Sequence, residues 1–192
     1  MESMKKIVII DGQGGRMGSL LTEKLKEICA ARSSNGTGSS GELCSGNGSG
    51  ENSKENGSGE NSKKSGSRES KAPSLHKSAC EPVEICAVGT NGIATSAMMK
   101  AGADYGATGE NPVLVNVRDA DLIIGPIGIL CADALFGEVT PRMAVAVGQS
   151  HAEKILLPVN KCRNHIVGIS DLSLSALVQD AVRYAEEWLR EH

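Results

Sequence analysis

A short apolar segment that leads directly into a glycine-rich loop, and then into an amphipathic helix, is the most constraining feature of this sequence. Residues 5–10 form the apolar segment, and Asp11 ends it. Glycines follow closely, at Gly12, Gly14, Gly15 and Gly18. Apolar side chains then recur at spacings of three and four, at Met17, Leu20, Leu21, Leu25, Ile28 and Cys29. This order predicts a strand buried on both faces, a tight loop and a helix packed on the sheet.

Short apolar runs also alternate with helical patterns in the C-terminal part of the chain. The apolar runs predict further strands at residues 83–88, 105–108, 122–124, 155–159 and 166–169. Helices are expected between them, with cap or stop residues at Asn91, Gly102, Asn111 and Thr140, together with a short helix at residues 130–136 and a closing helix over residues 174–189. Such alternation favours parallel pairing through right-handed crossovers. We therefore expect a single α/β domain, Rossmann-like and doubly wound, with a mostly parallel sheet of about five or six strands.

A polar segment separates the first helix from the second strand. From residue 33 to residue 78 the composition changes to Gly, Ser, Asn, Glu and Lys, and NGSGENSKE at residues 47–55 is almost repeated as NGSGENSKK at residues 56–64. Because large apolar side chains are scarce there, the segment is expected to be disordered. Each doubling of a flexible loop adds only about 0.6 kcal/mol of closure cost. One discontinuous domain, of residues 1–32 and 79–192, is expected.

Composition argues against several classes of partner. The formal charge of -3 and the aromatic content of 2% give no basis for nucleic-acid binding, which needs clustered Lys and Arg or stacking platforms. No apolar run approaches the roughly 20 residues of a membrane helix, and no secretory signal is evident. Because export is not expected, we expect a cytoplasmic protein, in which disulfides seldom persist. The six Cys also lack metal-type spacing, so we expect free thiols and no metal site.

The loops that follow the predicted strands are where a ligand is expected, because open parallel sheets bind ligands beyond the carboxyl ends of their strands. In the first loop, the spacing Gly12-x-x-Gly15-x-x-Gly18 permits a tight turn and brings backbone amides close to an anion at a helix N-terminus. A tight turn alone is the structural alternative. The candidate binding residues are Asp11, Gly12, Gln13, Gly14, Gly15, Arg16, Met17, Gly18, Thr90, Asn91, Asn111, Gly125, Pro126, Gly128 and Asn160.

Some of these candidates have structural alternatives of their own. Gly125, Pro126 and Gly128 follow the clearest central strand, where they either face a ligand or form a rigid turn. Asn111 either contacts a ligand or caps a helix. Asp11 either holds a ribose hydroxyl or a metal-bound water, or caps the glycine loop.

Two cysteines, Cys131 and Cys162, also fall just beyond predicted strands. A nucleophile, with His165 as its partner base, and a buried inert thiol are the alternatives there. The sequence shows no triad, metal cluster or matched acid and base. Catalytic residues therefore stay unassigned, and whether the protein is an enzyme stays open.

The motif GQGGRMG at residues 12–18 resembles the cofactor loop of dihydrodipicolinate reductases, which bind nicotinamide dinucleotides. Rossmann-type NAD sites usually place an acidic residue at the end of the second strand for the ribose hydroxyls. This chain has Gly89, Thr90 and Asn91 there instead. The missing acidic residue argues against NAD and leaves NADP or another nucleotide, such as a mononucleotide, open as the cofactor.

With the polar segment removed, the chain resembles the small bacterial family catalogued as domain of unknown function 3842. The motifs that carry the resemblance are DGQGG at residues 11–15, GTNxxATSAMxKAGA at 89–103, GATGEN at 106–111, DLIIGPIGI at 121–129 and LPVNKC at 157–162. The resemblance implies a bacterial, cytoplasmic protein and carries no particular activity.

From these features we expect a small-molecule-binding protein that takes a nucleotide or another phosphorylated metabolite at the glycine loop, in a sensing or regulatory role. A helix N-terminus contributes about 0.3–1 kcal/mol to anion binding, whereas micromolar affinity needs about 8 kcal/mol. Other loops must therefore contact the ligand. An NAD(P)-dependent reductase is the alternative, and a subunit of a complex, including a homo-oligomer, is a third.

Overall fold

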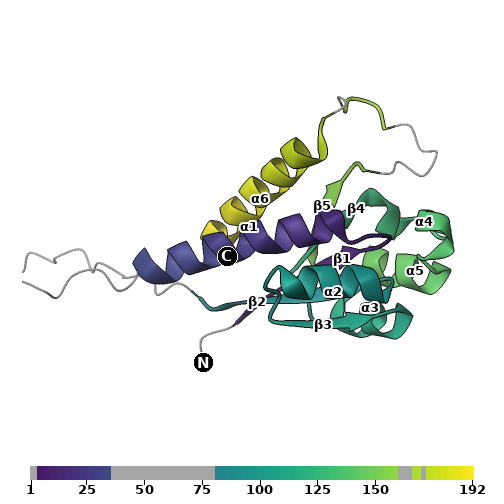
Figure 1. The fold of residues 1–192 in the computed structure, drawn as a ribbon, viewed down its shortest axis with the longest axis horizontal. Coiled ribbons are helices and arrows are strands. Elements are labelled where there is room, and N and C mark those ends of the chain that lie inside the picture. The colour runs from purple at the N-terminus through teal and green to yellow at the C-terminus, as the bar shows by residue number, and fades with distance from the viewer. Residues whose placement is uncertain (1–3, 36–80, 160–165, 170–171) are drawn as a thin grey trace, which may run out of the picture.

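The computed structural model describes residues 4–35, 81–159, 166–169 and 172–192. Within this part the chain forms an α/β fold around a five-stranded, all-parallel sheet of order β3-β2-β1-β4-β5 (Figure 1). The strands are β1 Lys5–Asp11, β2 Val83–Gly89, β3 Tyr105–Thr108, β4 Leu122–Pro126 and β5 Glu153–Leu157. The helices are α1 Arg16–Asn35, α2 Gly92–Lys100, α3 Glu110–Asn116, the 3-10 turn η1 Ile127–Leu130, α4 Ala134–Gly137, α5 Pro141–Gln149 and α6 Leu174–Glu191. The expected Rossmann-like, doubly wound sheet is confirmed.

Strand β1 lies at the centre of the sheet and is buried on both faces. Ile7 and Ile9 pack into one core, whereas Val8 and Ile10 pack into the other. Successive side chains of a strand point to opposite faces, so an uninterrupted apolar run serves both cores. This burial is why a segment of only seven residues specifies the middle of the sheet.

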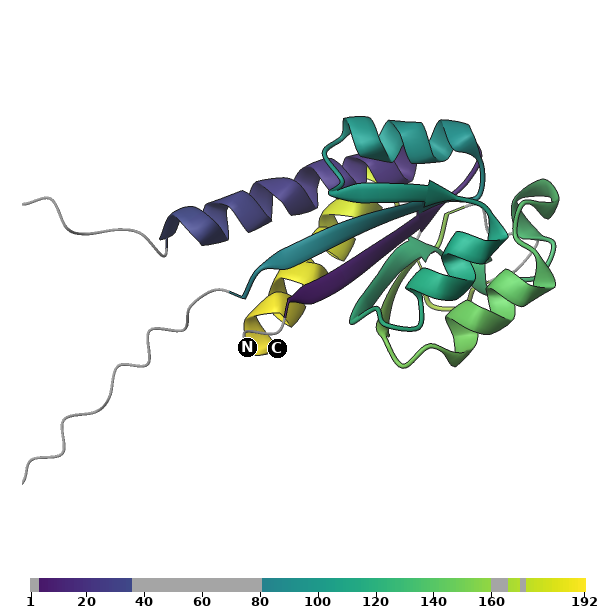
Figure 2. The ribbon, with the colours of Figure 1, turned by 90° about the horizontal axis from the view of Figure 1, so that it is seen from below.

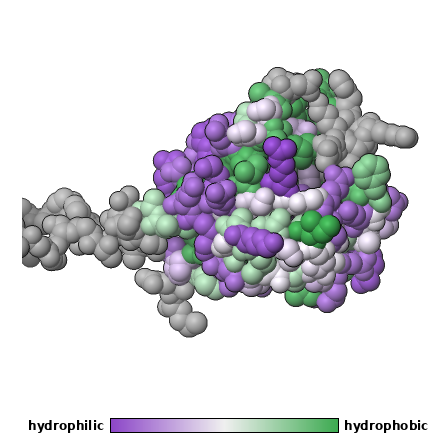
Figure 3. All heavy atoms as spheres, in the orientation of Figure 1, coloured by the Kyte–Doolittle hydropathy of each residue, from purple (hydrophilic) through white to green (hydrophobic). Residues whose placement is uncertain are grey.

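Helices cover both faces of the sheet (Figure 2). Helices α1, α2 and α6 contribute to the core that holds Ile7, and α3, α4 and α5 contribute to the core that holds Val8. Helices α1 and α6 lie side by side although they come from opposite ends of the chain. In the space-filling view, hydrophilic residues gather where α1 and α6 face outward, as their amphipathic patterns predict (Figure 3).

Most of the expected helix boundaries are confirmed. Asn91 caps α2 by accepting a hydrogen bond from the amide of Ala94, and Thr140 caps α5 by accepting one from Met143. Gly102, with φ +104°, follows the end of α2 as expected. The cap predicted at Asn111 is wrong: α3 begins at Glu110, and its N-cap is Gly109 with φ +102°. A left-handed glycine turns the chain from β3 into the helix two positions earlier than the Asn-Pro pair suggests.

Three other expectations differ from the structure. Residues 166–169 form no strand, because Val167 and Gly168 make an exposed turn in which Gly168 has φ +84°. The right-handed helix expected at residues 130–136 is replaced by η1 and by the short α4, whose Leu135 has a left-handed backbone. Strand β5 begins at Glu153, two residues before its predicted start.

The polar segment is only partly within the described residues. Helix α1 continues to Asn35, so its last three residues belong to the segment expected to be disordered. The remainder of that segment, residues 36–78, lies outside the described residues, and the division into residues 1–32 and 79–192 stays a prediction. Among the described helices, none combines the length and the apolar character needed to cross a membrane.

Candidate functional site

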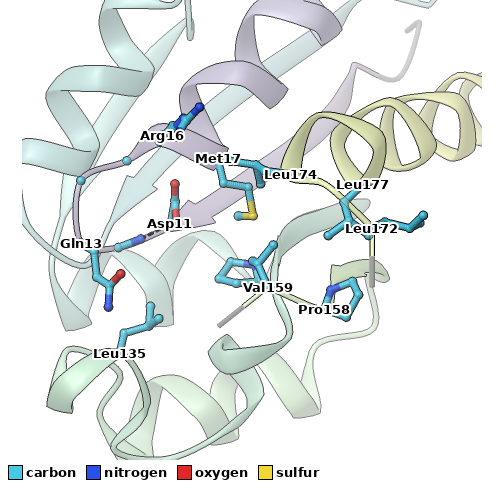
Figure 4. Close-up of a pocket in the computed structure, with 14 residues that line it drawn as sticks. Asp11, Gln13, Arg16, Met17, Leu135, Pro158, Val159, Leu172, Leu174 and Leu177 are labelled. Carbon is cyan, nitrogen blue, oxygen red and sulfur yellow. Dashed lines mark hydrogen bonds between the residues drawn. The ribbon is translucent and has the colours of Figure 1, made fainter. Parts of the chain in front are cut away.

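The carboxyl ends of β1 and β4 meet at the switch in strand order, because the chain leaves β1 toward β2 and leaves β4 toward β5. Ligands of open parallel sheets bind at this place. A cavity of about 380 Å³ lies there, between the glycine loop on one side and the start of α6 on the other (Figure 4). Its lining consists of Asp11, Gly12, Gln13, Gly14, Gly15, Arg16, Met17, Pro126, Leu135, Pro158, Val159, Leu172, Leu174 and Leu177.

Asp11, the last residue of β1, lies buried beneath the glycine loop. Its Oδ1 accepts a hydrogen bond from the amide of Gly12 at 2.8 Å, and its Oδ2 accepts one from the amide of Gly18 at 2.6 Å. Burial raises the pKa of Asp11 above its ordinary value, although the bonds from Gly18 and Gly12 oppose the shift. Asp11 therefore caps the loop and the start of α1, which was one of its two predicted roles.

Three of the four loop glycines are required by contacts inside the protein. A Cβ atom at Gly12 would lie 2.5 Å from Thr90 Oγ1, and one at Gly18 would lie 2.5 Å from Met98 Sδ. Gly15 has φ +67°, and a Cβ there would lie 2.6 Å from the Cα of Ala94 in α2. These glycines permit close packing of loop, helix and strand, which is the structural alternative for the motif.

Gly14 is different from its neighbours in the loop. A Cβ atom built at Gly14 would meet no heavy atom within 4 Å, and Gly14 is exposed. The backbone amides of Gly14 and Arg16 donate to no acceptor among the described residues. The side chain of Arg16 is exposed and extends away from Asp11 (Figure 4). These two amides are the part of the loop that stays available to an anion.

Glu138 is a site residue that the sequence analysis missed. Its Oε2 accepts hydrogen bonds from the amide of Gln13 at 2.9 Å, from Asn91 Nδ2 at 3.0 Å and from the hydroxyl of Thr90. Burial acts to raise the pKa of Glu138, but the bonds from Thr90, Gln13 and Asn91 outweigh burial and lower it. The carboxylate of Glu138 therefore accepts the hydrogen bond of one backbone amide in the glycine loop, that of Gln13.

The turn that presents Glu138 has an unusual backbone. Asp133, Leu135 and Phe136 all have positive φ, at 62°, 54° and 59°, and Gly137 follows with φ 86°. Residues other than glycine rarely adopt this conformation, at a cost of roughly 1–2 kcal/mol each. Leu135 is buried and lines the cavity, whereas Phe136 is 99% exposed. A strained turn thus carries both a wall of the cavity and the residue that binds the loop.

A second, more open groove lies on the β2 side of the loop. It has a volume of about 960 Å³ and is lined by Gln13, Asn91, Gly92, Ile93, Ser96, Ala97, Lys100 and Glu138. Gln13 lines both this groove and the cavity near α6. The bond between Gln13 and Glu138 therefore lies where the two hollows adjoin.

The remaining predicted site residues are dispersed. Thr90 and Asn91 bind Glu138, and Asn91 Nδ2 also donates directly to the carbonyl oxygen of Gln13 in the loop at 3.0 Å. Pro126 lines the cavity. A Cβ atom at Gly125 would lie 2.6 Å from the carbonyl oxygen of Ile10, so that glycine allows β4 to approach β1.

Three of the more distant candidates do not line the cavity. Gly128 is buried in η1, Asn111 is exposed on α3, and Cys131 is a partly buried thiol after η1. Asn160, Cys162 and His165 lie outside the described residues. Within the part of the chain that is described, no cluster of three His, Cys, Asp or Glu side chains is placed to hold a metal ion.

The chain belongs to the family described as a domain of unknown function, DUF3842, whose family model matches residues 71–190. The matched residues contain strands β2 to β5 and helix α6, and the glycine loop precedes them in the sequence. No curated protein and no solved structure matches the chain.

Proposed function

We propose that this protein binds a nucleotide or another phosphorylated small molecule in the cavity beside the glycine loop, in a sensing or regulatory role. The observation that carries the proposal is the position of Gly14, which adjoins the cavity at the switch point with open space around it. The fold itself does not require a glycine there, and the adjacent amides of Gly14 and Arg16 are available to phosphate oxygens.

The size and lining of the cavity agree with a small ligand. Its volume of about 380 Å³ falls within the range of about 300–1,000 Å³ that is usual for ligand sites. Apolar side chains from Met17, Leu135, Leu174 and Leu177 contribute to its wall. Such a wall supplies the larger share of the affinity that a helix N-terminus alone cannot provide, since about 25 cal/mol is gained for each Å² of apolar surface buried.

Binding without a reaction is favoured by the side chains present. Asp11 and Arg16 are the ionisable residues among the described residues that line the cavity. Both carboxylate oxygens of Asp11 accept amide hydrogen bonds, and its burial disfavours the charged form that a general base needs. This arrangement supports a role in sensing or regulation.

The proposal is tested with thermal shift and titration calorimetry against AMP, GMP, FMN, sugar phosphates, NAD and NADP. At least one compound is expected to raise Tm in the wild type, and Gly14→Val is expected to lose the response because the added side chain fills the approach to the amides. Gly148→Val is the matched control, since Gly148 in α5 also has open space around it but lies away from the loop. If no compound binds, or if Gly14→Val responds as the wild type does, the proposal fails.

An NADP-linked reductase is the second candidate, and one observation favours it. The groove on the β2 side is lined by Lys100, a cation for a ribose phosphate, as well as by Glu138, and residues 89–91 at the end of β2 themselves include no acid. The resemblance of GQGGRMG at residues 12–18 to the cofactor loop of dihydrodipicolinate reductases also favours a nicotinamide dinucleotide. NADPH oxidation with a panel of carbonyl and imine substrates tests this candidate, and failure to bind NADPH at millimolar concentration would end it.

A further inference from the structure

On the basis of the proposed function, we propose that Glu138 is a specificity-determining residue of the site. Its carboxylate keeps dinucleotides off the glycine loop and confines the ligand to the cavity beside β4 and α6. The ligand class that follows is a phosphate monoester of mononucleotide size with an apolar or aromatic body.

The first step is the position of the Glu138 carboxylate. Dinucleotides bind across both halves of a doubly wound sheet, with the pyrophosphate on the amides of the first glycine loop. Here the amide of Gln13 donates to Glu138 Oε2 at 2.9 Å, so it is not available to a pyrophosphate oxygen. A dinucleotide that crossed the loop would meet a carboxylate at the place where its own negative charge must lie.

The second step is how firmly the carboxylate is held. Asn91 and Thr90, both at the end of β2, donate to the same Oε2 that accepts the amide of Gln13. Gly12 allows this approach, because a Cβ atom there would lie 2.6 Å from Glu138 Oε2. In dinucleotide loops the first glycine serves the tight turn, whereas here the missing side chain at Gly12 also admits the Glu138 carboxylate. The hydrogen bonds also favour the charged form of Glu138, which repels a second anion.

The third step concerns the part of the site that Glu138 leaves open to a ligand. On the α6 side of the Gln13–Glu138 bond, the amides of Gly14 and Arg16 adjoin the cavity of about 380 Å³. Leu172, Leu174 and Leu177 form part of its wall, which suits an apolar or aromatic body better than a second sugar and phosphate. A ligand with one phosphate at the loop and one apolar body in the cavity would use both the available amides and the apolar wall.

The test measures dissociation constants of the full chain for FMN, AMP, NAD and NADP by titration calorimetry. We expect the wild type to bind one of the monophosphates at least about tenfold more tightly than either dinucleotide, a factor that corresponds to 1.4 kcal/mol. Glu138→Ala is expected to bind NAD or NADP about tenfold more tightly than the wild type while its monophosphate affinity changes by less than about twofold. Glu138→Gln, which keeps the shape and loses the charge, is expected to show part of this gain.

Glu110→Ala is the matched control, because the Glu110 carboxylate also accepts a threonine hydroxyl, from Thr140, but does so away from the loop. It is expected to bind all four compounds as the wild type does. Should Glu138→Ala fail to fold by circular dichroism, Glu138→Gln alone decides, and an unchanged dinucleotide affinity then overturns the inference. Equal binding of monophosphates and dinucleotides by wild type and variants overturns the inference and leaves the proposed function standing. If neither the wild type nor any variant binds any of the four compounds, both this inference and the proposed function are overturned.

Discussion

The carboxylate of Glu138 accepts a hydrogen bond of 2.9 Å from the backbone amide of Gln13, although the two residues are 125 positions apart in the sequence. Asp11 binds the amides of Gly12 and Gly18 in the same loop. Two carboxylates of the protein thus satisfy amides that in other loops of this type receive a phosphate. These two carboxylates therefore help to hold the conformation of the loop, and the individual loop positions are expected to respond differently to substitution.

Gly14 and Gly15 are adjacent, but valine is expected to be tolerated only at Gly14. At Gly15 the left-handed φ of +67° and a Cβ distance of 2.6 Å to Ala94 impose strain and overpacking, so Gly15→Val is expected to lower the free energy of unfolding by at least about 2 kcal/mol. At Gly14 the space is open, and the change is expected to stay within about 0.5 kcal/mol. Urea unfolding monitored by circular dichroism measures both. Equal losses would show that Gly14 is also required by the fold.

Asp11→Asn is expected to destabilise the protein although it removes a buried charge. The carboxylate serves two amides, those of Gly12 and Gly18, and an asparagine side chain has a single acceptor oxygen. One buried amide then loses its partner, at a cost of about 1–3 kcal/mol in the free energy of unfolding. Asp119→Asn is the control, because that carboxylate is 69% exposed in its ion pair with Lys6 and should contribute less than about 1 kcal/mol. Similar values for the two variants in urea unfolding would contradict the capping role of Asp11.

The stabilisation contributed by Glu138 is expected to disappear in acid. Because its pKa is lowered in the folded protein, the folded state favours the charged form. That stabilisation is fully present above the unfolded pKa of about 4.3 and is lost as the pH falls through the folded pKa. Glu138→Gln should therefore be less stable than the wild type near neutral pH, and the difference should shrink below about pH 4. Urea unfolding of both proteins across this range measures the difference, and a gap that is constant with pH would refute the assignment.

Much of the fold could be predicted from the sequence because its signals are local. The apolar run of β1, the stripe of α1 and the caps Asn91 and Thr140 each depend on residues within a turn or two of one another. The sequence-based predictions were wrong where the structure depends on a contact between distant residues or on an unusual backbone conformation. The apolar residues after 165 resemble a strand, but Gly168 with φ +84° turns the chain, and nothing in a short apolar run distinguishes the two outcomes.

The candidate site was predictable in part for the same reason. Strand, loop and helix are contiguous in the sequence, so the sequence alone predicts that Asp11 and the glycines lie together. Glu138 could not be predicted in this way, since it reaches Gln13, Thr90 and Asn91 from a turn formed much later in the chain. That turn has left-handed residues that are not glycine, and no sequence rule predicts positive φ at Leu135 or Phe136.

The left-handed turn before Glu138 is expected to store strain that glycine relieves. Phe136 has φ 59°, which costs roughly 1–2 kcal/mol, and its side chain is 99% exposed, so little packing is lost when it is removed. Phe136→Gly removes the strain but adds about 0.4–1 kcal/mol of entropy to the unfolded chain, which leaves a gain of zero to about 1.6 kcal/mol. Phe136→Ala keeps the strain and should stay within about 0.5 kcal/mol of the wild type. Urea unfolding compares the three proteins. A loss above about 1 kcal/mol in Phe136→Gly alone would mean that the turn needs the stiffness of a substituted backbone to hold Glu138 against the loop.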